Sequence, residues 1–176
     1  MRKGGRWKAY WLIVICLIHP PAPALSVRPE TISLRAGTST PWISQRYHQH
    51  TLGLRFQLPW QGELLNWRLA SHLDTEISHL RGPDDTAWLY SLGPSITLSR
   101  WGLALDMGIL PSYLSRDQLG RRQFGGSFQF TSHIGLSYQL NRHVRFGYRL
   151  QHISNANVYK SNDGLDVQAI ELWLGF

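Results

Sequence analysis

Apolar and polar side chains alternate along most of this 176-residue chain. A period of two residues is typical of β-strands whose two faces meet different surroundings. In the segment 143–154, for example, Val144, Phe146, Tyr148 and Leu150 share one face. Turn residues separate similar stretches, and helix signals are nearly absent. The pattern predicts eight strands, at 31–37, 51–58, 64–75, 87–98, 101–109, 128–140, 143–154 and 166–176.

The predicted connections alternate between short turns and longer loops. Short turns are expected at 59–62, at Ser99-Arg100 and at Asn141-Arg142, and the segment 115–126 is the longest loop. Several strands are about ten residues long, which is the length that a tilted strand needs to cross a membrane. Short periplasmic turns and longer external loops are typical of outer-membrane barrels.

The second face of the strands is too highly charged for the dry core of a soluble sandwich. A barrel with apolar side chains outside and polar ones inside accommodates both faces, and eight strands leave an interior filled by side chains. The sequence therefore predicts an all-β fold, an eight-stranded antiparallel transmembrane (outer-membrane) β-barrel. We interpret the inward charges as a paired structural network rather than a transport path. These are Arg68, His72, Asp74, Asp106, Arg145, Arg149 and Glu171.

Residues 1–24 have the form of a secretory signal peptide. Four basic residues precede an apolar run at 9–18, and Ala22-Pro23-Ala24 matches an A-x-A cleavage site. An uncleaved anchor is the alternative, but about ten apolar residues are too few to span a bilayer. We therefore expect an exported chain, with a barrel domain at 25–176 that lies in the outer membrane of a bacterial cell.

Removal of the signal peptide changes the charge and the available chemistry. The formal net charge of +7 falls to +3, because four basic residues and no acidic ones are lost. Nucleic-acid binding thereby loses its main support. The single cysteine, Cys16, also lies in the signal, so the mature chain has no thiol chemistry.

Two polar residues, His152 and Ser154, continue the apolar face of the segment 143–154. By parity they face outward at the external end of their strand. A register that is symmetric about Lys160 places Asp166 opposite Ser154, with His152 one diagonal step away. A serine, a base and an acid in this arrangement suit acyl transfer, which also needs oxyanion donors such as Asn155 and Asn162.

Less specific interpretations of the same residues remain open. Hydroxyl, amide and carboxylate groups are ordinary at the polar rim of a barrel. His48 and His50 share a face and could bind a metal ion, but no third ligand is evident nearby in the sequence. The external loop with Arg116, Arg121 and Arg122 could contact lipid phosphates or be simply solvated.

The run His152-x-Ser154-Asn155, followed by Asn162-x-Gly164 and a terminal strand that ends in Phe176, resembles the PagL-type lipid A 3-O-deacylases. The resemblance implies an outer-membrane enzyme that hydrolyses the ester-linked acyl chain at position 3 of lipid A, without a metal or organic cofactor. It also implies that Ser154 is the nucleophile, His152 the general base and Asn162 an oxyanion donor. Asn155 matches the asparagine beside the nucleophile, which contributes a backbone or side-chain donor.

One position departs from the family. The family's third catalytic member is typically a glutamate twelve residues after the serine, and here that residue is Asp166. Glu171 is the other candidate acid, but its parity points into the lumen. The competing functions are a non-enzymatic barrel for integrity or adhesion, and a lipid acyltransferase. The expected partners are lipopolysaccharide and membrane lipids; the sequence does not give the oligomeric state, the acyl-chain preference or latency in the native membrane.

Overall fold

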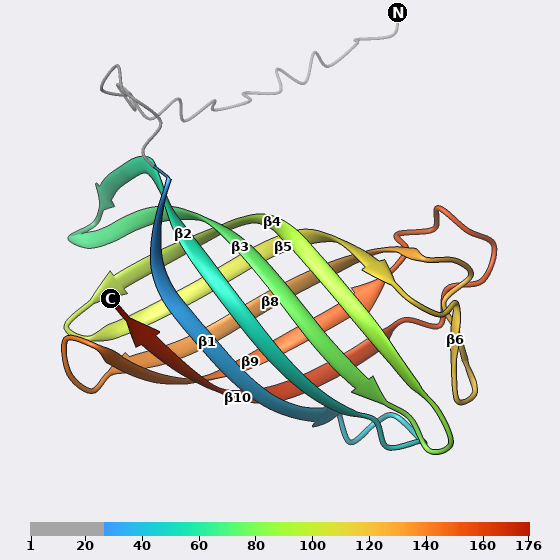
Figure 1. Ribbon diagram of the computed structural model, residues 1–176. Helices are drawn as coiled ribbons and strands as arrows, with labels where there is room; N and C mark the ends of the chain where they lie inside the picture. The colour runs from blue at the N-terminus through green and yellow to red at the C-terminus, as the bar shows by residue number, and fades with distance from the viewer. Residues whose placement is uncertain (1–26) are drawn as a thin grey trace, which may run out of the picture.

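The computed structural model describes residues 27–176, which form a closed barrel of eight long antiparallel strands (Figure 1). Consecutive long strands pair with one another, and β1 closes the barrel by pairing with β10. The predicted eight-stranded antiparallel β-barrel is confirmed, whereas the predicted signal peptide lies outside the described residues. The strands are β1 (Arg28–Ser39), β2 (His48–Leu64), β3 (Trp67–Arg81), β4 (Thr86–Arg100), β5 (Leu103–Leu114), β8 (Phe128–Gln139), β9 (Val144–Ser154) and β10 (Leu165–Gly175).

Two of the tight turns lie further along the chain than the sequence predicted. The segment 59–62 is not a turn; it continues β2, where the register to β3 shifts between Gln57 and Gln61. The chain reverses instead at Leu65 and Asn66, which both have positive φ angles (51° and 64°). Two-residue hairpins require such angles, and a bulge accommodates residues that disrupt regular pairing. In the same way, β4 continues through Arg100 and the turn is formed by the next two residues.

The long external loop contains a small hairpin, made by β6 (Gln118–Leu119) and β7 (Arg122–Gln123). This loop folds over the barrel end that is opposite to the tight turns (Figure 1). Its Leu119 and Phe124 are fully buried, and they join a hydrophobic cluster inside the external end of the barrel. The other members are Tyr47, Leu80, Ala87, Leu89, Leu114, Ile153, Leu165 and Val167.

Between this cluster and the barrel end with the tight turns, ion pairs fill the interior. Arg55 binds Asp74 at 2.7 Å and Asp106 at 2.8 Å, and Arg149 contacts Asp106 and Glu171. A third arginine, Arg35, and Glu76 extend the same network (2.6 Å). Pairing of this kind is what buried charges require, so the inferred structural network is confirmed for Asp74, Asp106, Arg149 and Glu171. His72 pairs with Glu30 (3.0 Å), Arg145 donates to Gln139, and Arg68 is exposed at the lumen mouth.

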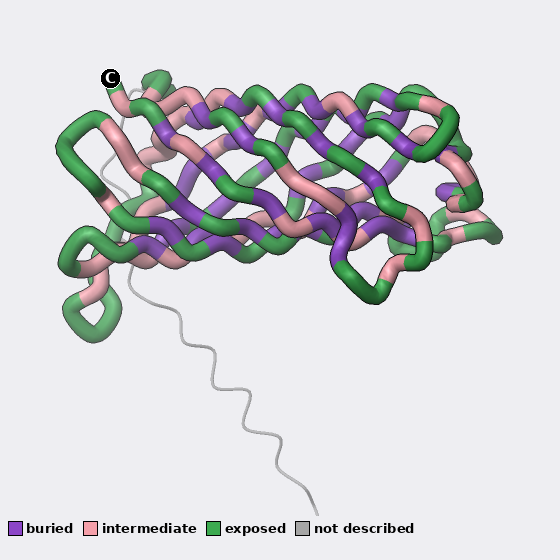
Figure 2. Tube along the Cα trace, turned by 90° about the horizontal axis from the view of Figure 1, so that it is seen from below, coloured by how far each residue is buried: buried purple, intermediate pink, exposed green. Residues whose placement is uncertain are grey.

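Buried and exposed residues alternate along each strand, so the inner and outer faces are chemically distinct (Figure 2). The exposed positions on the outer face are largely apolar, and they include Leu52, Leu92, Ile134 and Leu136. No helix within residues 27–176 is long and apolar enough to cross a membrane. The exposed large side chains of the barrel are mostly apolar, so the polar side chains on the outer face differ from their surroundings.

Candidate active site

His152 and Asp166 form a hydrogen-bonded pair on the outer face, near the external end of β9 and β10. The two residues are directly opposite one another in the β9–β10 register. The Nδ1 atom of His152 lies 2.6 Å from an Oδ1 atom of Asp166. A carboxylate can only accept, so Nδ1 donates and Nε2 is left free to take a proton. The side chains remain 50% and 40% exposed, which keeps the pair accessible from outside the barrel.

The predicted register of this hairpin is therefore wrong by two residues, because Asp166 faces His152 and not Ser154. The loop between the strands is not symmetric about Lys160: Ala156 and Asn157 have positive φ angles near its start, and Gly164 has one at its end. The sequence pattern contained no information on this uneven curvature. The correction brings the acid closer to the histidine than expected.

The buried neighbours of these residues fix the outward direction of the pair. Ile153, Leu165 and Val167 alternate with the site residues and are at most 1% exposed. A shift of one residue would turn the whole apolar set out and the polar set in. Packing inside the barrel therefore holds the candidate site on the outer face. Glu171, the alternative acid, points inward and pairs with Arg149, as parity predicted.

Trp42, in the loop between β1 and β2, provides a contact that the sequence analysis missed. Its indole Nε1 donates to the second carboxylate oxygen of Asp166 at 3.3 Å. The backbone N–H of Thr40 in the same loop also donates to the Asp166 carbonyl oxygen (3.0 Å). Asp166 is thus held on both carboxylate oxygens, by His152 and by Trp42. The contact joins positions 124 residues apart, and no sequence motif pointed to it.

Ser154 lies on the same face, two residues beyond His152 at the end of β9, and is half-buried. Within residues 27–176, no hydrogen bond joins its hydroxyl group to His152. Catalytic hydrogen bonds of this kind are often loose in structures without substrate. A second serine, Ser132 on β8, faces outward directly opposite His152, on the side away from Asp166. The structure therefore presents two candidate nucleophiles, and the sequence analysis identified only one.

The surroundings of the two serines differ. Ser132 lies in the middle of β8, between β5 and β9, where the backbone groups belong to the sheet ladders. Ser154 is the last residue of its strand and adjoins the loop 155–164, whose amide groups are not all committed to a ladder. Because acyl transfer needs donors for an oxyanion, the position of Ser154 suits a nucleophile better.

Asn155 and Asn162 hold this loop together. The side chain of Asn155 is fully buried and donates to the carbonyl oxygens of Phe124 (2.7 Å) and Ser161 (2.6 Å). Its backbone N–H donates to Oδ1 of Asn162. The Asn155 side chain is therefore committed to the loop in this conformation, and donation to an oxyanion by its backbone or side chain stays a prediction. The Asn162 Nδ2 group, which contacts Asn157 at 3.3 Å, is exposed and can be redirected.

Arg122 of the arginine-rich loop contacts the chain beside His152. The sequence had left open whether this loop contacts lipid phosphates or is simply solvated. Arg122 donates to the backbone carbonyl oxygens of Asp163 (2.7 Å) and Gly164. Gly164 in turn lies against the His152 ring: a Cβ atom at Gly164 would be 3.1 Å from Cε1 of His152. Arg122 thus stabilises the chain beside the histidine, whereas the Arg116 side chain is exposed.

A shallow groove of about 410 Å³ crosses the outer face at this place. Polar groups of Trp42, Ser132, His152 and Asp166 line one part of it, and Ile134 and Leu150 line the apolar remainder. Ser154 lies beyond the residues that line this groove. A ligand with an apolar chain and a polar, reactive group would match this arrangement.

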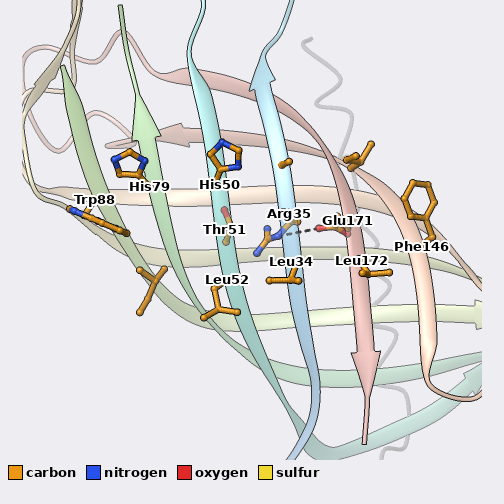
Figure 3. Close-up of a pocket in the computed structure, with 13 residues that line it drawn as sticks. Leu34, Arg35, His50, Thr51, Leu52, His79, Trp88, Phe146, Glu171 and Leu172 are labelled. Carbon is orange, nitrogen blue, oxygen red and sulfur yellow. Dashed lines mark ion pairs between the residues drawn. The ribbon is translucent and has the colours of Figure 1, made fainter. Parts of the chain in front are cut away.

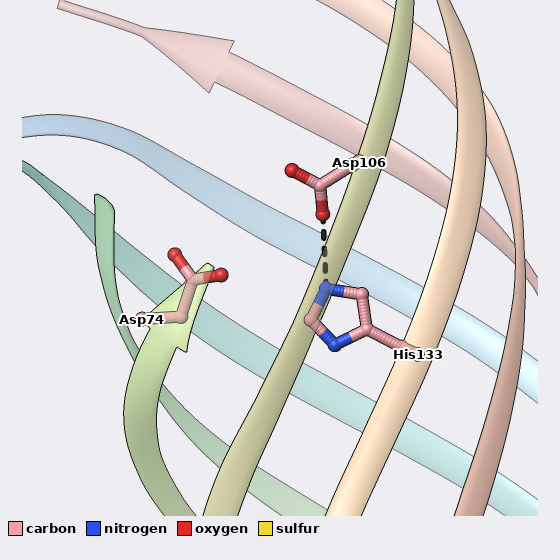
Figure 4. Close-up of side chains that lie close together, drawn as sticks. All are labelled: Asp74, Asp106 and His133. Atoms are coloured by element: carbon pink, nitrogen blue, oxygen red, sulfur yellow. Dashed lines mark hydrogen bonds and ion pairs between the residues drawn. The ribbon is translucent and has the colours of Figure 1, made fainter. Parts of the chain in front are cut away.

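The candidate metal ligands from the sequence do not assemble into a site. His48 and His50 both face outward, and in the described part of the chain only Asp74, Asp106 and His133 form a group of three potential ligands. His133 contacts Asp106 at 3.0 Å inside the barrel (Figure 4). Both carboxylates already bind Arg55, so we assign this group to the ion-pair network.

Comparisons with known proteins relate the chain to one group. The family described as lipid A 3-O-deacylase (PagL) matches residues 30–174. The lipid A deacylase PagL of Bordetella bronchiseptica (strain ATCC BAA-588 / NCTC 13252 / RB50) is 34% identical over 77 residues, which are 42% of this chain and 43% of that protein. The crystal structure of the outer membrane enzyme PagL is similar with a TM-score of 0.71 and 20% identity, covering 83% of this chain and 99% of that one. At this identity, the structural likeness shows the fold.

Proposed function

Because this chain belongs to the lipid A 3-O-deacylase (PagL) family, we propose that it is a serine esterase of the bacterial outer membrane. Its substrate is lipid A, and its reaction is hydrolysis of the ester-linked acyl chain at position 3. The observation that carries the proposal is the His152–Asp166 pair on the outer face, within a groove that also has an apolar wall. An ester of a membrane lipid reaches that face without leaving the bilayer.

In the first step, the Ser154 hydroxyl oxygen attacks the ester carbonyl carbon, and His152 Nε2 takes the hydroxyl proton. Asp166 holds the imidazole by its Nδ1–H and stabilises the positive charge that forms. The carbonyl oxygen becomes an oxyanion, for which Asn162 Nδ2 and the loop backbone supply donors. The tetrahedral intermediate then expels the 3-oxygen of the sugar, which receives the proton from His152.

In the second step, water attacks the acyl group on Ser154, and His152 again acts as the base. The products are a free fatty acid and lipid A with a hydroxyl group at position 3. Water reaches the acyl-enzyme because the pair lies near the external end of the strands, where the membrane surface meets the solvent. An acyltransferase would replace this water by another lipid hydroxyl group, and a purely structural barrel would release no fatty acid.

Substitution of the nucleophile tests the proposal. Ser154→Ala should lower the rate of fatty-acid release from lipid A by at least about a thousandfold, because loss of a catalytic nucleophile removes the covalent step. The matched variant Ser132→Ala should lower the rate less than tenfold. The measurement is mass spectrometry of the products formed by the purified, folded barrels.

The opposite ranking of the two serine variants would move the nucleophile to Ser132. If both variants released fatty acid at the wild-type rate, a serine mechanism would be refuted. Transfer of the chain to a second lipid, without free fatty acid, would favour the acyltransferase.

The Trp42 contact predicts a smaller effect on the same reaction. Trp42→Phe keeps an aromatic ring and removes the donor to Asp166, so kcat should fall roughly three- to tenfold, as expected for a hydrogen bond worth about 1 kcal/mol. KM should change little. In an Asp166→Ala background, the Trp42 substitution should have no further effect on kcat, whereas additive effects would show that Trp42 acts separately from the acid.

Gly164 predicts a steric effect on the histidine. Its φ angle is +58°, and an added Cβ would press on the His152 ring. Gly164→Ala should therefore lower kcat by more than tenfold, because the ring is displaced and the loop is strained. Gly62→Ala is the control, since a Cβ at Gly62 meets no atom within 4 Å. Equal kcat values for the two variants would contradict the placement of His152 against Gly164.

A further inference from the structure

A compact block of basic side chains lies on the outer face at the external ends of β2 and β3. His48 is directly opposite Arg81, and His50 is directly opposite His79. All four side chains point outward, and three of them are exposed. Figure 3 shows His50 and His79 on neighbouring strands, with Trp88 beside His79. We call these four residues the basic block.

The basic block lacks an acidic partner. Within residues 27–176, none of its side chains forms an ion pair or a side-chain hydrogen bond. The outward positions on either side are Ala36 and Thr38 of β1 and Thr86 and Trp88 of β4, none of which is acidic. Side chains directly opposite in a sheet have Cβ atoms about 5 Å apart, and like charges there are unfavourable. Four N–H-bearing groups without an acceptor form a place where an anion would be stabilising.

An apolar groove of about 640 Å³ continues from the basic block along the strands toward the middle of the barrel. Its walls include Leu34, Leu52 and Leu172 (Figure 3). Ile77 and Ile170 also line it. Trp88 lies at the junction, with its ring centroid 4.9 Å from that of His79. Tryptophan is enriched where lipid head groups meet hydrocarbon. The order of basic groups, tryptophan and apolar groove therefore corresponds to the phosphate, interface and acyl chain of a lipid.

This surface is separate from the candidate active site. The basic block lies on β2 and β3, whereas His152, Asp166 and Ser132 lie on β8, β9 and β10. In the barrel, β1 separates β2 from β10. The apolar groove reaches β9 and β10 through Phe146, Ile170 and Leu172, but it shares no lining residue with the site's own groove.

We propose that the outer face from β3 across β2 and β1 to β10 binds one phosphorylated lipid of the outer leaflet. The lipid phosphate accepts hydrogen bonds from the basic block, and one acyl chain lies in the apolar groove. The inference rests on the proposed membrane location of the barrel, but not on its proposed ester hydrolysis. A bound lipid at this place would anchor the external end of β2 and β3.

The test is lipid retention by the full mature barrel, reconstituted in phosphatidylcholine nanodiscs that contain a small fraction of phosphatidic acid. Native mass spectrometry after release into detergent counts the lipids that remain bound. We expect one phosphatidic acid to be retained by the wild type, and at least fivefold less by the double variant His50→Gln/Arg81→Gln. The control His143→Gln/Arg116→Gln removes the same residue types from exposed turns and should retain the lipid as the wild type does.

Three results would overturn the proposal. Equal retention by the test variant and the wild type would exclude the basic block, and equal retention of phosphatidylcholine would mean that only the apolar surface matters. If inorganic phosphate alone displaced the retained phosphatidic acid, the basic block would be a site for free anions. If the double variant does not fold, the single variants His50→Gln and Arg81→Gln are measured, and each should show a partial loss. The readout is bound lipid, so these results do not depend on whether the chain hydrolyses lipid A.

Discussion

The strict inward–outward alternation of β9 and β10 couples the packed interior of the barrel to the chemistry on its outer face. Ile153, Leu165 and Val167 are buried in the hydrophobic cluster at the external end, and the residues between them must therefore point outward. His152 and Asp166 point outward because the residues next to them along the chain are packed inside the barrel. The interior ion pairs and the cluster thus serve the site indirectly, since they make a one-residue slip of the strands costly.

Contacts from the loops fix the positions of the site residues more closely than strand pairing alone does. Arg122 holds the carbonyl oxygens beside Gly164, the Asn155 side chain ties the hairpin loop to Phe124, and Trp42 reaches Asp166 from the loop after β1. Aspartate is one methylene shorter than the glutamate that is typical of the PagL family at this position. The direct pairing with His152 and the second hydrogen bond from Trp42 explain how the shorter acid still contacts the imidazole.

The sequence was sufficient for the strands, the barrel and the faces, because alternation depends only on which residues avoid water. It failed at 59–62, where turn-forming residues are accommodated in a bulged strand, and in the register of Asp166, which depends on the positive φ angles at Ala156 and Asn157. The Trp42 contact and the position of Ser132 opposite His152 were missed for a different reason. Both depend on which strands and loops become neighbours in the closed barrel, and a one-dimensional pattern does not contain that information.

We expect the site on the outer face to remove an ester-linked chain from a lipid in the same leaflet. The most direct measurement is the mass of lipid A from bacteria that lack such an activity, with and without expression of this chain. Expression should convert lipid A to a species lighter by one 3-linked hydroxyacyl chain, with the free hydroxy fatty acid recovered. An unchanged lipid A mass, while the folded barrel is present in the outer membrane, would contradict this expectation.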